Sequence, residues 1–346
     1  MARHRLRARE YVCAALGVVI GVSCFVITNR VTKEWMDPLV AACLTGEYAT
    51  PTDRILSEHI VPYEPRLGGG FVCLITQFLE ALVSNYPGGI LTWGSVILVS
   101  GPFSVVAGVE AGRVGSHGPI RYSILMGMLA QLLGVCVVMP AVWIPSYILF
   151  GSRCNDSDGL FLFHPQRPWH AVYTFIIPTL LTFGLFWWEP SSSTAWKQCA
   201  GLLGGPALAF LPLVYYWSPT PSSKEMQPTD AERAKVSYRN ALKVVGFLSF
   251  VGWIGLVYIA VSAYGFHILT AIMNGLWTNA HPAVKFMTVD TIGFFLATMI
   301  YAYLQSPLAM WRMAKLVPLL GPGAAFSYIM VIQTESTHVV GDTKKQ

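Results

Sequence analysis

Long apolar runs constrain this chain more than any other feature, because about 20 apolar residues match the hydrocarbon core of a bilayer. Alternating apolar and polar strands of the kind that build membrane barrels are absent. The sequence therefore predicts an all-α fold, a polytopic transmembrane helical bundle of about 8–9 spans. The candidate spans are residues 11–28, 69–86, 90–109, 122–150, 170–187, 197–216, 241–263, 288–305 and 316–333. Pro318, Gly321, Pro322 and Gly323 interrupt the last one and make it the weakest.

The composition predicts one integral membrane domain over residues 1–333. Charged residues make up only 12% of the chain, about half of their share in soluble domains. The polar, proline-containing residues 217–240 are interpreted as a cytoplasmic linker, and residues 334–346 as a disordered tail. Within the linker, Thr229 and Glu232 form a capping-box pattern, so a basic helical extension is expected to lead into the seventh span. No internal repeat is visible in the sequence.

The first span, within residues 1–28, follows the basic start MARHRLRARE. It could open a signal peptide, but its apolar stretch is longer than a typical signal core and no cleavage site ends it cleanly, so a retained anchor is expected. Basic residues are in modest excess on the side of the N-terminus, which places that side in the cytoplasm. Asn29–Gly68 is then expected in the lumen, with a short helix from Thr52 to Val61, and Ser218–Asn240 in the cytoplasm.

Several familiar sites are missing from the sequence. The seven cysteines contain no C-x-x-C pair, so neither a disulfide framework nor a zinc site is indicated. Phosphate-binding glycine loops, a G-x-S-x-G elbow and a basic nucleic-acid surface are also absent. Cys154–Asp158 looks like a diphosphate–magnesium motif, but it is one residue short and has no second aspartate-rich partner. We therefore expect no metal, no cofactor and no nucleic-acid partner.

Two carboxylates lie at the edges of apolar runs. Glu110 is followed one helical turn later by Arg113, and Asp290 opens the eighth run. A carboxylate at such a position is costly unless it is paired or faces a polar cavity, which marks it as a functional candidate; the alternative is an interfacial anchor. If every run crosses the membrane, Glu110 and Asp290 both fall at the lumenal end and line one pocket.

Other polar and aromatic side chains could complete such a pocket. Tyr122 and Gln131 lie on the fourth run, Trp93 on the third and Tyr301 on the eighth, and these four are the candidate substrate-binding residues. Apolar surroundings favour the protonated form of a carboxylic acid, which can then act as a donor. Aromatic ring faces stabilise a developing cation. The alternative for the aromatic residues is interface belts and core packing.

A series of blocks in this order covers most of residues 65–333: Pro65–Gly68 with VCLITQFLEALVSNYPGGILTW, the Glu110-x-x-Arg113 pair, YSILMGMLAQLLGVCVVMPAVW, Asp290, and Leu320–Ala325. These blocks are similar to those of the membrane-bound terpene cyclases of fungal meroterpenoid pathways, of the ascofuranone and macrophorin type. Where that family has Asp-Gly at the end of the second span, this chain has Ser84-Asn85, so the role of that aspartate is vacant or has passed to Glu80.

The resemblance implies a terpene cyclase of the endoplasmic reticulum membrane. Its substrate would be a lipophilic, prenylated molecule, a farnesylated aromatic or polyketide-derived compound, cyclised after protonation of an epoxide or olefin. Asp290 is the first candidate for the proton donor and Glu80 the second; helix capping is the alternative role for Asp290. Glu110, paired with Arg113, would orient the substrate or stabilise the cation. The rival readings are a multi-pass transporter and a non-enzymatic membrane protein of a secondary-metabolite cluster.

Overall fold

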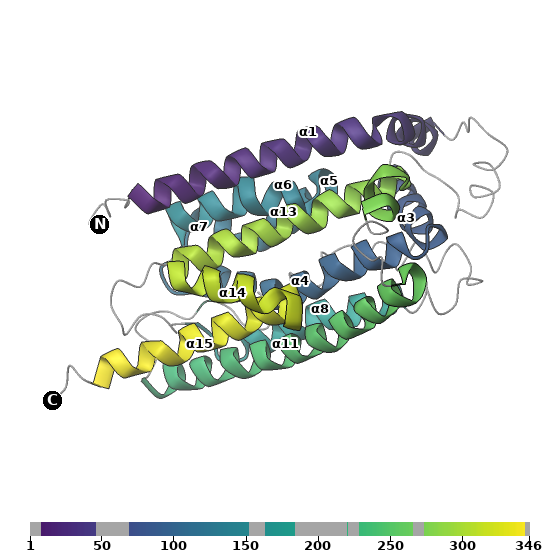
Figure 1. Cartoon of the computed structure of the whole chain (residues 1–346). Helices are drawn as coiled ribbons and strands as arrows, with labels where there is room; N and C mark the ends of the chain where they lie inside the picture. Colours follow the sequence, from purple (N-terminus) through teal and green to yellow (C-terminus); the bar gives the residue numbers. More distant parts are fainter. Residues whose placement is uncertain are drawn as a thin grey trace.

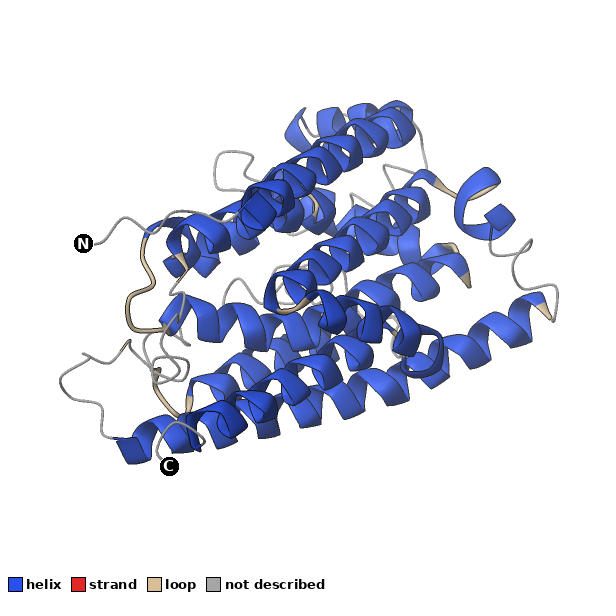
Figure 2. Cartoon of the chain, turned by 60° about the vertical axis from the view of Figure 1, so that its left-hand side comes forward, coloured by secondary structure: helices blue, strands red, loops and turns tan. Residues whose placement is uncertain are grey.

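The computed structural model describes residues 8–45, 69–151, 163–183, 220, 228–265 and 273–342. These residues form a bundle of helices and contain no strand (Figures 1 and 2). Four helices are long and apolar enough to cross a membrane: α1 (Ala8–Thr45), α4 (Gly88–Gly112), α11 (Pro228–Tyr264) and α13 (Pro282–Gln305). The prediction of an all-helical protein is confirmed for the described residues, and these four helices are candidate membrane spans; the count of eight or nine spans is not confirmed.

Both α1 and α11 extend beyond the predicted apolar runs. Helix α1 continues through Asn29–Thr45, which was expected to be a loop, and α11 starts at Pro228, inside the expected linker. Proline suits the first position of a helix because it has no amide hydrogen to leave unpaired. The i, i+3 pair of Arg233 and Asp230, 3.7 Å apart, supports the first turns of α11. The helical extension expected from the capping-box pattern of Thr229 and Glu232 is therefore present, as the first turns of α11.

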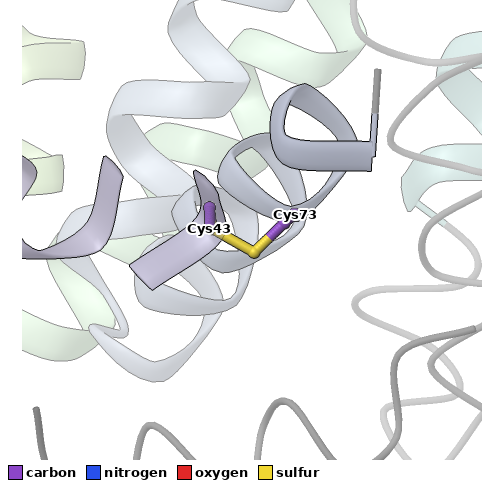
Figure 3. Close-up of a disulfide and its surroundings, with 2 residues drawn as sticks. All are labelled: Cys43 and Cys73. Carbon is purple, nitrogen blue, oxygen red and sulfur yellow. A yellow bond between two sulfur atoms is a disulfide. The ribbon is translucent and has the colours of Figure 1, made fainter. Parts of the chain in front are cut away.

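Helix α3 (Gly69–Ser84) does not cross the bundle. We call the end that holds the start of α1 the near end, and the end that holds the start of α13 the far end. Cys73, early in α3, forms a disulfide with Cys43, near the end of α1 (Figure 3). Gly88, just after α3, lies against Val284, near the start of α13. Both ends of α3 are thus at the far end, and the sequence prediction missed this disulfide.

The predicted fourth span is a hairpin that enters the bundle and returns. It comprises η2 (Gly118–Arg121), α5 (Ser123–Leu133), α6 (Val135–Val138), η3 (Met139–Trp143) and α7 (Ile144–Phe150), and we call it the first hairpin. The amide of His117 donates to the carbonyl of Phe150 at 3.2 Å, so the two ends of this segment meet. The chain reverses at Gly134, whose φ of 91° is readily reached only by glycine.

The predicted ninth span is also a hairpin, formed by α14 (Pro307–Leu320) and α15 (Pro322–Asp342), which we call the second hairpin. It reverses at Gly321, which has a φ of 78° and lies against Trp253. Helix α15 then returns to the near end, where Glu335 lies 3.8 Å from Arg239. The expected disordered tail is therefore helical as far as Asp342. Figure 1 shows the start of α1 and the end of α15 at the same end of the bundle.

The helices form two similar sets, although no repeat is visible in the sequence. One set is α1, α4 and the first hairpin; the other is α11, α13 and the second hairpin. Helix α1 packs against α13 and the first hairpin, while α11 packs in the same way against α4 and the second hairpin, and α4 contacts α13. The similarity lies in how the two sets pack, and the sequence shows no matching repeat.

The remaining described elements are α8 (Arg167–Phe183), which packs against α4 and α11, and η5 (Asn274–Thr278). Helix α13 is capped by His281, whose ring Nδ1 accepts a hydrogen bond from the amide of Ala283 at 3.2 Å. Burial lowers the pKa of His281, which keeps this ring nitrogen available as an acceptor. The predicted span 197–216, the Thr52–Val61 helix and the Cys154–Asp158 motif lie outside the described residues.

Candidate functional site

A cavity of about 330 Å³ lies between α3, α4, α8, the first hairpin and α13. It follows α4 from Trp93 to Gly108, a length of about 22 Å at 1.5 Å per helical residue. Its volume falls within the range of small-molecule sites, about 300–1,000 Å³. Aromatic rings from five elements line it: Phe78, Trp93, Phe103, Trp143, Phe175, Phe286 and Phe294.

The cavity wall is held by edge-to-face contacts between these rings. The centroid of Phe103 lies 4.8 Å from that of Trp143 and 5.2 Å from that of Phe294. Phe78 of α3 and Phe286 of α13 make a similar contact at 5.4 Å, which closes the wall toward the far end. Such pairs add about 0.5–1.5 kcal/mol beyond the burial of area, so the shape of the cavity is set by packing rather than by a single helix.

Asp290 is the only titratable residue among the described residues that line the cavity. It is 6% exposed, and its Oδ1 accepts a hydrogen bond from the backbone amide of Cys136 at 2.8 Å. Asp290 does not cap its own helix, which begins at Pro282. It caps the returning arm of the first hairpin instead. A carboxyl group is thus fixed at the hairpin turn, in a cavity whose other polar lining residues are the uncharged Ser100, Ser104, Gln131, Thr179 and Thr182.

Two of the predicted substrate-binding residues lie in this cavity with Asp290. Trp93 contributes from α4, and Gln131 contributes from α5, just before the hairpin turn. Tyr122 lies at the start of α5 and is 56% exposed, and it does not line the cavity. Glu80 is half-buried on α3 and is also outside the cavity lining.

Glu110 and Arg113 form the predicted pair, but the pair lies at the near end of the bundle and not at the end that holds Asp290, where it was expected. Arg113 Nη2 lies 3.1 Å from Glu110 Oε1, and the hydroxyl of Tyr301 donates to the same oxygen at 2.9 Å. Asp290 precedes Tyr301 by eleven positions on α13, or about 16 Å along the helix axis. The single pocket expected to hold both carboxylates is therefore not present in the described structure.

The reason for this difference is the path of α3. Because α3 stays at the far end, α4 runs toward the near end, and Glu110 arrives beside the start of α1 rather than opposite it. Arg9 of α1 donates to the carbonyl of Leu304 at 3.1 Å, close to Tyr301. Glu110, Arg113 and Tyr301 are buried in this near-end polar cluster and do not line the cavity. Glu110 Oε2 and Arg113 Nε have no hydrogen-bond partner there.

The residues that hold Asp290 in place were not predicted to do so from the sequence. Gly134 and Cys136 surround the carboxyl at the hairpin turn, and Trp143 forms the cavity wall nearest the near-end cluster. Gly134 was the residue that could have indicated the hairpin turn, because it is a glycine within an apolar run that was predicted to be one continuous span. Such a glycine often marks a close approach of two backbones or a break in a helix.

Among the described residues, no three His, Cys, Asp or Glu side chains lie together as a metal site would require. Comparisons with protein-family models, with characterised proteins and with solved structures found no match for this chain.

Proposed function

We propose that this protein is a membrane-bound terpene cyclase and that Asp290 starts the reaction by donating a proton. The observation that carries this proposal is the placement of one carboxyl group in a cavity walled by aromatic rings. An apolar substrate would reach such a cavity from the bilayer. The substrate class is a prenylated, farnesylated, aromatic or polyketide-derived molecule with a terminal epoxide or olefin.

The reaction would be an isomerisation. The O–H bond of Asp290 breaks, and the proton goes to the epoxide oxygen or to an olefin carbon. In the epoxide, the C–O bond then breaks and leaves a hydroxyl group and a cation on carbon; in the olefin, the π electron pair forms the new C–H bond and leaves the cation. The π electron pairs of neighbouring double bonds form the new C–C bonds. Finally a C–H bond next to the last cation breaks, its electron pair forms a double bond, and its proton restores the Asp290 acid. No electron donor or acceptor is needed. Trp93, Phe103 and Trp143 would face the cation with electron-rich ring faces, and the apolar walls would exclude water that could otherwise trap it.

The remaining polar candidates take supporting roles in this proposal. Gln131 would bind the polar head of the substrate, because it lines the same cavity as Asp290. Glu110, Arg113 and Tyr301 would stabilise the near end rather than act on the substrate, because the cavity does not reach them. Glu80 remains the second candidate for the acid, and Tyr122 is the weakest of the binding candidates.

We propose the endoplasmic reticulum membrane as the location, with the near end in the cytoplasm. Among the described residues, basic side chains are more frequent at the near end, where Arg9, Arg233 and Arg239 lie, as expected for a cytoplasmic side. The disulfide of Cys43 and Cys73 lies at the far end, and disulfides form in oxidising compartments such as the lumen.

The test is turnover by Asp290→Asn in microsomes supplied with farnesylated phenols and their terminal epoxides. The amide oxygen of asparagine can still accept from Cys136, so the hairpin cap is retained, but the side chain has no acidic proton. We expect cyclised product, measured by mass spectrometry, to fall about 10²–10⁴-fold at unchanged expression. Glu80→Gln is the comparison variant: it stays active if Asp290 is the acid and loses turnover if Glu80 is the acid. Full turnover by Asp290→Asn would move the acid to Glu80 or end the cyclase proposal.

A transporter is the second candidate, and the two similar helix sets favour it. Transporters are often built from structural repeats, with a substrate site between the repeats near the middle of the membrane. In reconstituted vesicles, a transporter would move a labelled prenylated phenol across the bilayer without converting it. Transport without any change in the chemical structure of the substrate would favour this reading over the cyclase.

A further inference from the structure

Two cysteine thiols lie behind Asp290, on the side away from the cavity. Cys136 follows the turn of the first hairpin, and Cys24 is on α1; neither belongs to a disulfide. They are buried in one cluster with Val137 and Val289. Cys24 does not line the cavity, and neither does Cys136. Cys136 therefore contacts the carboxyl, and Cys24 contacts Cys136, from outside the cavity that a substrate would fill.

The contacts form a chain from α1 to α13. The backbone amide of Cys136 donates to Asp290 Oδ1 at 2.8 Å. Cys136 Sγ lies on the same side of the turn as the carboxyl, because a Cβ on Gly134 would be 3.0 Å from Asp290 Oδ1 and 3.4 Å from Cys136 Sγ. Side-chain hydrogen bonds link the Cys136 thiol to the Asp290 carboxyl and to the Cys24 thiol. Gly293, one turn after Asp290, leaves the space for both cysteine side chains, because a Cβ there would meet Cys24 Sγ at 2.7 Å and Cys136 Cβ at 2.6 Å.

We propose that Cys136 and Cys24 are positioning residues that orient and activate the Asp290 carboxyl. This inference rests on the proposed role of Asp290 as the proton donor. The Cys136 thiol donates to the carboxyl together with the backbone amide, and the Cys24 thiol fixes the direction of the Cys136 S–H bond. With donors on the buried side of the carboxyl, its acidic proton is left for the cavity side.

Proton donation leaves a negative charge on Asp290. When the proton leaves, a carboxylate remains in an apolar setting, and each hydrogen-bond donor that already points at it lowers the barrier. A thiol is a weak donor in water. In a buried network a hydrogen bond is electrostatically stronger. Neither sulfur atom needs to react, so no oxidant or reductant takes part.

Infrared spectroscopy of the purified full chain tests this without a substrate. The C=O stretching band of protonated Asp290 is the carboxylic-acid band that disappears in Asp290→Asn. In Cys136→Ala this band should move to higher frequency, because the carboxyl loses a donor. In Cys136→Ser it should move to lower frequency, because a hydroxyl is a stronger donor than a thiol. Cys13→Ala, a buried free cysteine on α1 that is eleven positions from Cys24, is the matched control and should leave the band in place.

The same variants are then assayed for turnover. Cys136→Ala should lower kcat about tenfold with KM unchanged, in line with the loss of one hydrogen bond to a charged group. Cys136→Ser should retain the wild-type rate. Cys24→Ala should lower kcat by a smaller factor.

The outcomes separate the two proposals. A band that stays in place in both Cys136 variants would overturn the role of the thiols and leave the cyclase proposal intact; the serine variant decides if the alanine variant does not fold. The absence of any band sensitive to Asp290→Asn would mean that Asp290 is ionised, which would overturn both proposals.

Discussion

Replacing Gly134 by alanine tests how the hairpin turn holds the cavity together. Gly134 has φ 91° and ψ 144°, a backbone region used almost only by glycine, where another residue costs on the order of 1–3 kcal/mol. An added Cβ would lie 3.0 Å from Asp290 Oδ1 and 3.2 Å from Phe286 Cζ. The carboxyl must then move from the Cys136 amide, which costs about 1 kcal/mol more. We expect Gly134→Ala to lower the free energy of unfolding by about 2–4 kcal/mol in total.

Two other glycines provide matched controls for the separate contributions. Gly265→Ala has a φ of 65° but no atom within 4 Å of the new Cβ, so it measures the backbone cost alone. Gly255→Ala lies within α11 and also meets no atom within 4 Å, so it should gain about 0.5–1 kcal/mol from helix propensity. The assay is thermal unfolding in detergent, followed by size-exclusion chromatography.

The expected order of stability is Gly255→Ala, wild type, Gly265→Ala and then Gly134→Ala. If Gly134→Ala unfolded at the same temperature as Gly265→Ala, the contact with Asp290 would contribute nothing. If it unfolded at the wild-type temperature, the reasoning about the hairpin turn would be refuted as a whole.

Three further predictions concern other parts of the molecule. Cys43→Ser removes a disulfide that joins residues 30 positions apart, and should cost about 3–4 kcal/mol in the loop-entropy account; a thermal shift no larger than that of Cys13→Ser would contradict this. Glu110→Gln leaves Arg113 as an unpaired buried charge and should lower the free energy of unfolding by about 3–5 kcal/mol. We therefore expect a reduced yield of folded protein, which the double variant Glu110→Gln with Arg113→Met restores. A single variant that is well folded but inactive would instead argue for a direct role of Glu110 in catalysis. Because burial lowers the pKa of His281, its capping contribution is complete above the unfolded pKa of about 6.5 and is lost as the pH falls; His281→Asn, a cap that does not titrate, should flatten this part of the stability profile, and an unchanged profile would exclude His281.

The sequence predicted the composition of the cavity better than the path of the chain. Asp290, Gln131 and Trp93 were identified from their chemistry and lie in one cavity. Glu110 was assigned to the wrong end because the direction of each predicted span depends on the number of spans before it. One run that does not cross the membrane therefore reverses the predicted direction of every helix after it. The 16 residues of α3 were read as a crossing, so α4 was assigned the wrong direction. Hydropathy measures the length of a run and not whether the chain turns back within it.

The two hairpins were missed for a related reason. Residues 122–150 are apolar throughout, and a helix that crosses and a pair of shorter helices that return bury similar surface. Only the backbone at Gly134 and Gly321 distinguishes the two. In the second hairpin the cluster of Pro318, Gly321, Pro322 and Gly323 did reduce the expectation of a span. In the first hairpin a single glycine gave too little signal.

The first hairpin also constrains the order in which the protein can be assembled during synthesis. Its turn is capped by Asp290, 154 positions after Cys136, and polar backbone of this kind is tolerated at membrane depth only when it is covered by protein. When α5 to α7 have been synthesised, the helix that carries Asp290 has not yet been made. The turn of the first hairpin can therefore receive its cap only after synthesis of α13. Truncation just before Asp290 would leave a chain with most of its apolar residues and no means of completing its first half.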